Sequence, residues 1–405
     1  MTLQIKKNEM LLFLLVILFL SGRFTFGRIG GDLLGVFEVR YFLFFIVLMF
    51  GFLAKKKLCV TGKTTSGFTW LSLLFLPVLL FSIIYSSNVA IAADKFVEVV
   101  FLFCIILLTS YTVRLFRSSI RLLDAVTVVF SIVGVIYMIP ILLSILQGGA
   151  RGTIGIGGPN VTTRILFFAL VSGLYLYNTR SKILYMGLSS LMFMGIIFVG
   201  SRGGMVGAFT CIGIIIVLKI LQLNSRTMRK LFSARNLVAI ALVLLLSWRF
   251  LEPLFRVFES RFLNLVIRNI HYAGRDSIYG GSWDLFLESP IFGYGINGYA
   301  VMTGGNYPHN LFLEIMLDLG IIGVILIIPI LAIGAMSFLR SINKKYVYVS
   351  VLPLYMIIVQ QFSGDLYDFR FFFFWSILIL HCLDLDKIDS GVNKALLKTE
   401  VVNKD

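Results

Sequence analysis

The sequence is poor in charged residues and in cysteine. Asp, Glu, Lys and Arg make up 14% of its 405 residues, whereas 59% are hydrophobic, and the mean hydropathy is +0.95. These values exclude a water-soluble globular domain of ordinary composition and indicate a polytopic membrane protein. The four cysteines are isolated, with neither C-x-x-C nor metal-ligand spacing. We therefore expect neither a disulfide framework nor a zinc site.

The chain also lacks visible internal repeats, low-complexity tracts and a soluble domain. Paired broken helices in inverted repeats, which would indicate a secondary transporter, are not visible either. Positive charge is in excess, because 36 Lys and Arg stand against 20 Asp and Glu and give a net charge of +16. The positive-inside rule explains such an excess in a membrane protein. We therefore expect no nucleic-acid partner.

Long apolar runs predict an all-α membrane helix bundle of about twelve transmembrane helices, since about 20 residues of helix cross about 30 Å of hydrocarbon. The runs fall near residues 8–26, 36–54, 68–87, 96–113, 122–146, 161–178, 183–200, 204–221, 236–252, 309–339, 346–362 and 370–383.

Clusters of Lys and Arg predict how this bundle is oriented. One cluster precedes the first run, at residues 6–7. The others follow every second run, at residues 55–57, 114–121, 180–182, 219–235 and 340–345. We therefore expect these clusters and both termini in the cytoplasm. The predicted division is transmembrane helices 1 to 9 at residues 1–252, a long periplasmic loop at 253–308, transmembrane helices 10 to 12 at 309–383, and a cytoplasmic tail at 384–405.

The long outer loop is predicted to carry short amphipathic helices. Apolar side chains recur at helical spacing from Leu254 to Leu265, which predicts a helix along the membrane surface. A second short helix is predicted around Trp283 and Phe286, and simple packing onto the bundle explains it equally well. Residues 292–299 add tyrosines, glycines and an asparagine, a composition that suits either a sugar ring or the membrane interface.

The loop ends at Pro308-His309-Asn310, which opens directly into an apolar run. Proline suits the first position of a helix, and the free N–H groups and the helix dipole then attract an anion to that end. A histidine there can take a proton from a hydroxyl or, when protonated, bind phosphate. The alternative is that His309 only makes a structural hydrogen bond. Tyr307, Asn310 and Glu314 adjoin His309 as candidate substrate-binding residues.

Two glycine-rich turns on the outer face carry arginine. In the first, GSRGG at 200–204, an arginine at membrane depth is expected to have a partner or a ligand; a snorkelling arginine at a helix end is the alternative. The second runs from Arg151 to Asn160, with Arg164 just inside the next span. It lacks the ending of a P-loop, so we expect no nucleotide there. A cradle for an outer-leaflet pyrophosphate remains as the candidate role.

Asp365 and Asp368 resemble an acidic metal pair, but Arg370 follows them. An ion-paired loop is the preferred interpretation. The sequence therefore predicts no metal site.

Several of these motifs together resemble the O-antigen ligase/polymerase superfamily of bacterial envelope glycosyltransferases. The resemblance covers residues 200–323 and rests on the order and spacing of SRG at 201–203, GR at 274–275, PIFGYG at 290–295, PHNLFLE at 308–314 and the glycines at 320 and 323. It implies transfer of a glycan from an undecaprenyl-pyrophosphate carrier at the periplasmic side of the inner membrane, without nucleotide sugar, metal or another cofactor.

The resemblance also implies the catalytic residues. Family members place an arginine of the SRG turn, an arginine of the long loop and a histidine of the HN helix near the reaction centre. This carries over to Arg202, Arg275 and His309, with Arg261 and Arg268 as alternatives to Arg275. Guanidinium groups in a poorly hydrated site stabilise the charge that develops on a leaving pyrophosphate.

Polymerase and ligase differ in the acceptor. We expect a polymerase, which joins the glycan to another lipid-linked repeat unit, because the chain is rich in Phe, with 38, and diverges outside the core motif. The alternative is a ligase, which transfers the glycan to lipid A core. A flippase for the same lipid-linked sugar is the rival from another class, although polar residues crowd one face instead of lining a path. Expected partners are the undecaprenyl-pyrophosphate-linked oligosaccharide and membrane lipids, and a chain-length regulator is a further candidate.

Overall fold

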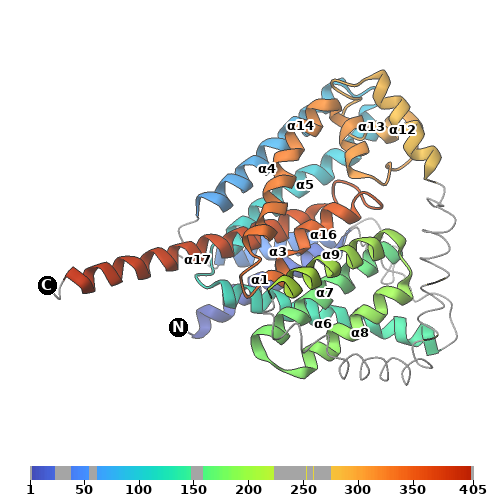
Figure 1. Cartoon of the computed structure of the whole chain (residues 1–405). Helices are drawn as coiled ribbons and strands as arrows, with labels where there is room; N and C mark the ends of the chain where they lie inside the picture. The colour runs from blue at the N-terminus through green and yellow to red at the C-terminus, as the bar shows by residue number, and fades with distance from the viewer. Residues whose placement is uncertain are drawn as a thin grey trace. The chain divides into compact units, whose positions relative to one another are not determined.

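The computed structural model describes residues 2–22, 38–53, 62–146, 158–222, 252, 259 and 275–402 (Figure 1). All regular secondary structure in these residues is helical. The helices are α1 (Thr2–Ser21), α3 (Val39–Leu53), α4 (Lys63–Phe81), η2 (Ser82–Tyr85), α5 (Val89–Val113), α6 (Ser119–Leu146), α7 (Gly158–Arg180), α8 (Ile183–Val199), α9 (Arg202–Leu221), α12 (Asp276–Glu288), α13 (Gly298–Thr303), α14 (Leu311–Arg340), α15 (Val347–Ser350), α16 (Leu352–Val359) and α17 (Arg370–Val402).

Five of the described helical stretches are long and apolar enough to cross a membrane. They are Lys63–Tyr85, Ser119–Ser144, Gly158–Arg180, Arg202–Leu221 and Leu311–Arg340. Each coincides with a predicted apolar run, so the prediction of an all-helical membrane protein is confirmed to that extent. The full count of about twelve spans stays a prediction, resting on the length that a helix needs to cross a bilayer.

The remaining predicted runs have several outcomes. Helices α3 and α8 are apolar but shorter than a full span, and the run at 346–362 is divided between α15 and α16. Helix α5 begins several residues before its predicted run and so includes Lys95. Helix α17 continues far into the predicted tail. The run at 236–252 and the surface helix predicted near Leu254 fall almost wholly outside the described residues.

The chain divides into two compact units. The first comprises residues 1–129, 278–346 and 352–405, and the second comprises residues 130–277 and 347–351.

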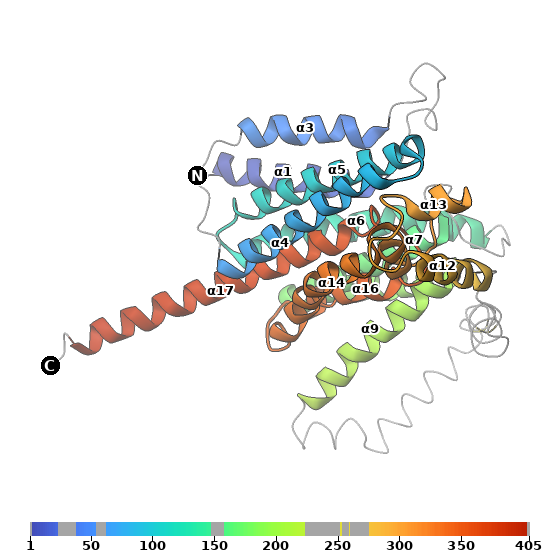
Figure 2. The same cartoon turned by 90° about the horizontal axis from the view of Figure 1, so that it is seen from above.

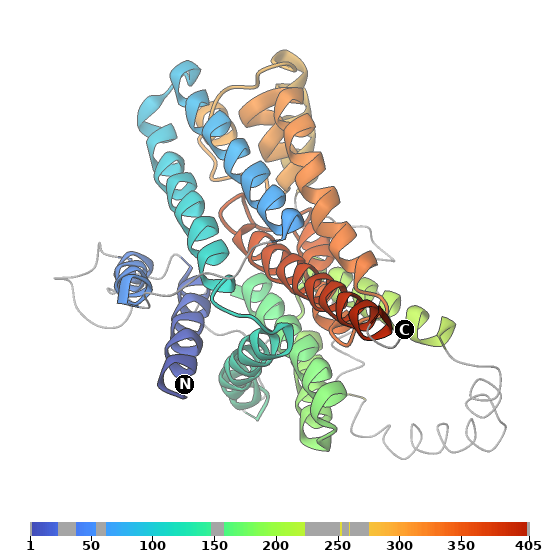
Figure 3. The ribbon, with the colours of Figure 1, turned by 90° about the vertical axis from the view of Figure 1, so that its left-hand side faces the viewer.

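Helix α4 is central to the first unit. It packs beside α5, α14 and α17, as the blue, cyan, orange and red ribbons of Figure 3 show, while α1 packs beside α3 and α5 (Figure 2). Phe68 of α4 meets Phe372 and Phe373 of α17 edge-on or tilted. The carboxylate of Asp384 accepts hydrogen bonds from the N–H and hydroxyl of Thr65, at 2.9 and 2.7 Å. This contact satisfies backbone at the start of α4, where a helix leaves N–H groups unpaired.

Helix α14 is interrupted at Gly320, which has φ 62° and ψ −152°. A break inside an apolar helix frees backbone groups that a membrane cannot hydrate, so protein groups must satisfy them. The segment between α12 and α13 does so. The replacement bonds run from Tyr294 N–H to the Leu317 carbonyl (2.7 Å), from Gly295 N–H to the Asp318 carbonyl (3.1 Å) and from Ile321 N–H to the Pro290 carbonyl (2.8 Å).

Small residues let the two backbones approach at this break. A Cβ atom on Gly293 would lie 2.5 Å from the Leu317 carbonyl oxygen, and one on Gly320 would overlap the backbone of Ile291. Both glycines have positive φ, a region that residues with a Cβ rarely adopt. The neighbour of Gly320 at this break is therefore the PIFGYG segment.

The second unit is built around α7, which packs beside α8 and α9 (Figure 1). Helix α7 also packs beside α15. Gly173 of α7 meets Ser189 of α8 so closely that a Cβ atom has no room. The Ser189 hydroxyl donates to the Leu170 carbonyl at 3.1 Å. Small residues at such contacts bring helices close together, as is common where lipid surrounds the bundle.

Candidate active site

The start of α14 differs from its prediction. The helix begins at Leu311, and Asn310 is its N-cap with extended backbone, so Pro308 lies before the helix. The Asn310 side-chain oxygen accepts from the N–H groups of Phe312 and Leu313, at 2.9 and 3.2 Å. These are the groups that were expected to attract an anion. The prediction of an open anion site at this helix end is therefore wrong.

His309 is held in a defined backbone conformation just before this cap. Its φ is +58°, in the left-handed region that non-glycine residues seldom occupy but histidine tolerates better than most. The Tyr279 hydroxyl of α12 is 3.4 Å from the His309 carbonyl oxygen and 3.2 Å from that of Gln361. The Tyr307 ring meets the imidazole edge-on, with centroids 4.4 Å apart. The predicted neighbours Tyr307 and Asn310 thus flank a half-buried, positioned imidazole.

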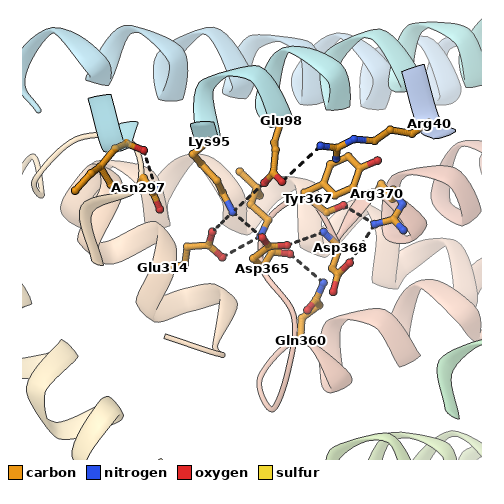
Figure 4. Close-up of polar contacts among 12 residues, drawn as sticks. Arg40, Lys95, Glu98, Asn297, Glu314, Gln360, Asp365, Tyr367, Asp368 and Arg370 are labelled. Carbon is orange, nitrogen blue, oxygen red and sulfur yellow. Dashed lines mark hydrogen bonds and ion pairs between the residues drawn. The ribbon is translucent and has the colours of Figure 1, made fainter. Parts of the chain in front are cut away.

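Glu314 lies one turn further along α14 and is buried. One carboxylate oxygen is 2.8 Å from the Lys95 ammonium of α5, and the other accepts the Leu366 N–H at 2.9 Å. Figure 4 shows Lys95 pointing between Glu314 and Asp365. The structure thus assigns Glu314 internal contacts, and its predicted role in substrate binding stays a prediction.

The turn that carries Asp365 and Asp368 is ion-paired, as expected. Asp368 contacts Arg370 at 3.1 Å, and Asp365 contacts Lys95 at 2.9 Å. The described residues hold no group of three or more His, Cys, Asp or Glu side chains that suits a metal ion. Sequence reasoning missed Lys95, although a lysine at the start of an apolar run was a usable signal, because charge at membrane depth seeks a partner.

Two arginines, Arg40 and Arg370, extend this cluster. Arg40 of α3 lies 3.8 Å from Glu98 and also contacts Glu38. The guanidinium carbons of Arg40 and Arg370 lie 4.6 and 4.5 Å from the centre of the Tyr367 ring. Such cation–π contacts hold charge in apolar surroundings. Figure 4 shows the continuous set of contacts from Arg40 to Glu314, and the sequence analysis did not anticipate Arg40 either.

Tyr294, in the segment that fills the α14 break, is a hydrogen-bond donor. Its hydroxyl lies 2.8 Å from the Leu285 carbonyl oxygen and 3.2 Å from the Glu288 carboxylate. Burial, and then the neighbouring Glu288, raise the pKa of Tyr294. The phenol therefore stays protonated and fixes the segment to α12.

In the second unit, the SRG turn joins two helices as predicted. Helix α8 ends at Val199 and is capped by Gly200, which has left-handed φ. Arg202 is the first residue of α9. The Ser201 hydroxyl accepts from the Gly204 N–H at 3.2 Å and donates to the Asn160 side-chain oxygen at 2.6 Å. The predicted substrate-binding residue Asn160 and the turn that carries Arg202 are thus brought together.

The other predicted arginines have different settings. Arg164 is buried on α7 with 2% of its surface exposed, and Arg275 is half-buried directly before α12. Arg151 lies outside the described residues. Arg202 and Arg275 belong to the second unit and His309 to the first. That these three meet at one reaction centre stays a prediction.

A comparison with protein families indicates the functional class of this protein. The model of the O-antigen ligase family matches residues 187–328. These residues are thus similar to the O-antigen ligase family. The matched segment contains the SRG turn, α12, α13 and the first part of α14, and so includes Arg202, Arg275 and His309. No curated protein matches the chain. The resemblance drawn from the motifs is confirmed.

Proposed function

We propose that this protein is a membrane glycosyltransferase that moves a growing glycan from undecaprenyl pyrophosphate to another lipid-linked repeat unit, at the outer face of the plasma membrane. The observation that carries the proposal is that all three predicted catalytic residues lie inside the segment matched by the O-antigen ligase family. The five apolar helices, long enough to cross a membrane, support a membrane-bound enzyme with lipid-linked substrates.

The proposed reaction is one displacement at the anomeric carbon. The acceptor hydroxyl oxygen forms a bond to that carbon, the bond from the carbon to the pyrophosphate oxygen breaks, and the pyrophosphate leaves with the electron pair. His309 takes the proton of the hydroxyl. Arg202 and Arg275 stabilise the charge on the pyrophosphate, because fixed guanidinium groups in a poorly hydrated site act strongly on developing charge.

The setting of His309 supports its role as a base. Its carbonyl is bound by Tyr279 and its ring is contacted by Tyr307, so little motion has to be frozen when the acceptor arrives. A base that is already oriented speeds the reaction, because its geometry is set before the acceptor binds. The fixed start of α9, where Ser201 caps the helix that Arg202 begins, supports the same argument for the arginine.

The second candidate is a ligase that uses lipid A core as acceptor. The description of the matched family, O-antigen ligase, favours it. The Phe-rich composition favours the polymerase. The two enzymes share the donor and the three catalytic residues proposed above.

A gel of envelope polysaccharide from cells that lack the gene, with and without plasmid rescue, tests the proposal. A polymerase defect leaves lipid A core with a single repeat unit, because ligation still occurs. A ligase defect leaves bare core while polymer accumulates on the lipid carrier. An unchanged ladder in the deletion strain would contradict both enzymes.

A further inference from the structure

Lys95 connects three parts of the first unit that are far apart in sequence. Its ammonium lies 2.8 Å from Glu314 on α14 and 2.9 Å from Asp365 in the turn before α17. The Glu98 carboxylate is 3.8 Å away, one turn along α5. The side chain of Lys95 is only 6% exposed, and those of Glu314 and Asp365 are 5% and 3% exposed. A single cation therefore lies between two buried carboxylates from different elements (Figure 4).

The same turn also holds the residues around His309. The Gln360 carbonyl accepts the Leu311 N–H at 3.0 Å. The Gln361 carbonyl accepts from the Asn310 amide at 3.2 Å and from the Tyr279 hydroxyl at 3.2 Å. The segment from Gln360 to Leu366 is thus joined to the start of α14 at two places, by hydrogen bonds at the cap and by the Lys95 cluster one turn later.

The second of these two junctions, between Glu314 and the 365–366 backbone, depends on Lys95. One oxygen of this carboxylate binds the ammonium, and the other accepts the N–H of Leu366, the residue that follows Asp365. Without the ammonium, Glu314 and Asp365 would face each other as two buried carboxylates. Buried like charges repel strongly where solvent does not screen them. One of the two carboxyl groups would have to take up a proton, or the first turns of α14 and the 360–366 segment would have to move apart. Either change removes the ion-paired junction.

We propose that Lys95 is a positioning residue for the transfer reaction. It holds Glu314 against Asp365 and thereby fixes the start of α14, which directly follows His309 and its neighbour Asn310, against the segment 360–366. The proposal rests on the proposed function, in which His309 takes the proton of the acceptor. A displacement of a catalytic group by about 1 Å lowers the rate by about 100-fold, so the position of this junction matters for turnover.

The test compares K95M with K95R in the full-length protein, purified and reconstituted in proteoliposomes. The substrate is undecaprenyl-pyrophosphate-linked repeat units. K95M removes the cation, and we expect kcat per folded molecule to fall by about 100-fold, with the donor KM within about threefold. K95R keeps a cation that can bind two carboxylates, so we expect it to restore kcat to within about tenfold of the unmodified protein. A normal kcat for K95M would overturn the proposal, as would a raised KM at unchanged kcat.

D384N is the matched control for lost stability. Asp384 is a buried carboxylate of the same unit that binds Thr65 at the start of α4, and no step of the proposed reaction uses it. We expect D384N to lower the thermal midpoint but to leave kcat per folded molecule unchanged. If D384N lowered kcat as much as K95M at an equal loss of stability, Lys95 would have only a structural role.

Hydrogen exchange provides a readout that does not depend on activity. We expect K95M to speed exchange of the Leu311 and Leu366 amides, which donate to Gln360 and Glu314, and D384N to speed exchange at Thr65. Uniformly faster exchange across the unit in K95M would contradict the proposal. H309A separates the two hypotheses. If H309A is fully active, the proposed role of His309 fails, whereas an inactive H309A with a fully active K95M overturns only the positioning role.

Discussion

At the scale of one residue, His309 combines a strained backbone with a half-buried imidazole. Its left-handed φ of +58° costs a residue with a Cβ roughly 1–2 kcal/mol, and the contacts with Tyr279 and Tyr307 maintain it. Strain that the surroundings enforce is frequent at functional sites. The sequence placed His309 correctly next to an apolar helix, but the conformation depends on Tyr279, which is 30 residues away.

Substitution of His309 by glycine should separate stability from activity. Glycine adopts positive φ without steric cost, so we expect H309G to be at least as stable as the unmodified protein within about 1 kcal/mol. We expect its glycan transfer to fall at least about 100-fold, because the base is lost. H309N, which also tolerates this conformation, should behave in the same way. Thermal midpoints in detergent and transfer rates measure the two effects, and an active H309G would exclude His309 as the base.

At the scale of one helix, the sequence did not predict the break in α14. The apolar run at 309–339 is continuous, so periodicity predicts one unbroken helix. The break depends instead on the backbone of the PIFGYG segment, which supplies the hydrogen bonds that the helix gives up. By contrast, α12 was predicted from local spacing alone, because its pattern does not depend on distant partners.

Alanine at Gly320 should disrupt this element. The φ of 62° with ψ of −152° is a conformation that essentially only glycine adopts, and a Cβ there would overlap Ile291. We expect G320A to lose at least about 2 kcal/mol of stability, seen as reduced folded abundance and a lower thermal midpoint. G67A on α4 is the control, because a Cβ at Gly67 meets nothing within 4 Å. Equal stability of both variants would show that the break is not required.

Helix α12 presents three different faces, which predicts that it lies at the membrane boundary. Phe286 is buried, Trp283 and Leu287 are 49% and 58% exposed, and Asp284 and Glu288 are exposed beside them. An exposed apolar stripe next to an acidic face suits a helix with one side in lipid. In intact cells we expect D284C to react with a membrane-impermeant maleimide and L287C to be protected. Equal labelling of both cysteines would place the stripe in water.

For the whole molecule, composition and hydropathy predicted the class, and local motifs predicted the family. The contacts that organise the first unit were beyond reach, because Lys95 and Asp365 are separated by 270 residues and no local pattern pairs them. A lysine at the start of an apolar run indicates that a partner exists without identifying it. The SRG turn was predictable for the opposite reason, since Ser201 caps the helix that follows it directly.

The most direct test of the account is a transfer assay with the purified protein in proteoliposomes that contain only undecaprenyl-pyrophosphate-linked repeat units. We predict that the unmodified protein forms longer lipid-linked chains and releases undecaprenyl pyrophosphate in equal number to the bonds formed. We predict that R202A and H309A, at matched amounts of folded protein, lower that rate at least about 100-fold. Undiminished transfer by either variant would contradict the proposed active site, and no chain growth by the unmodified protein would contradict the polymerase.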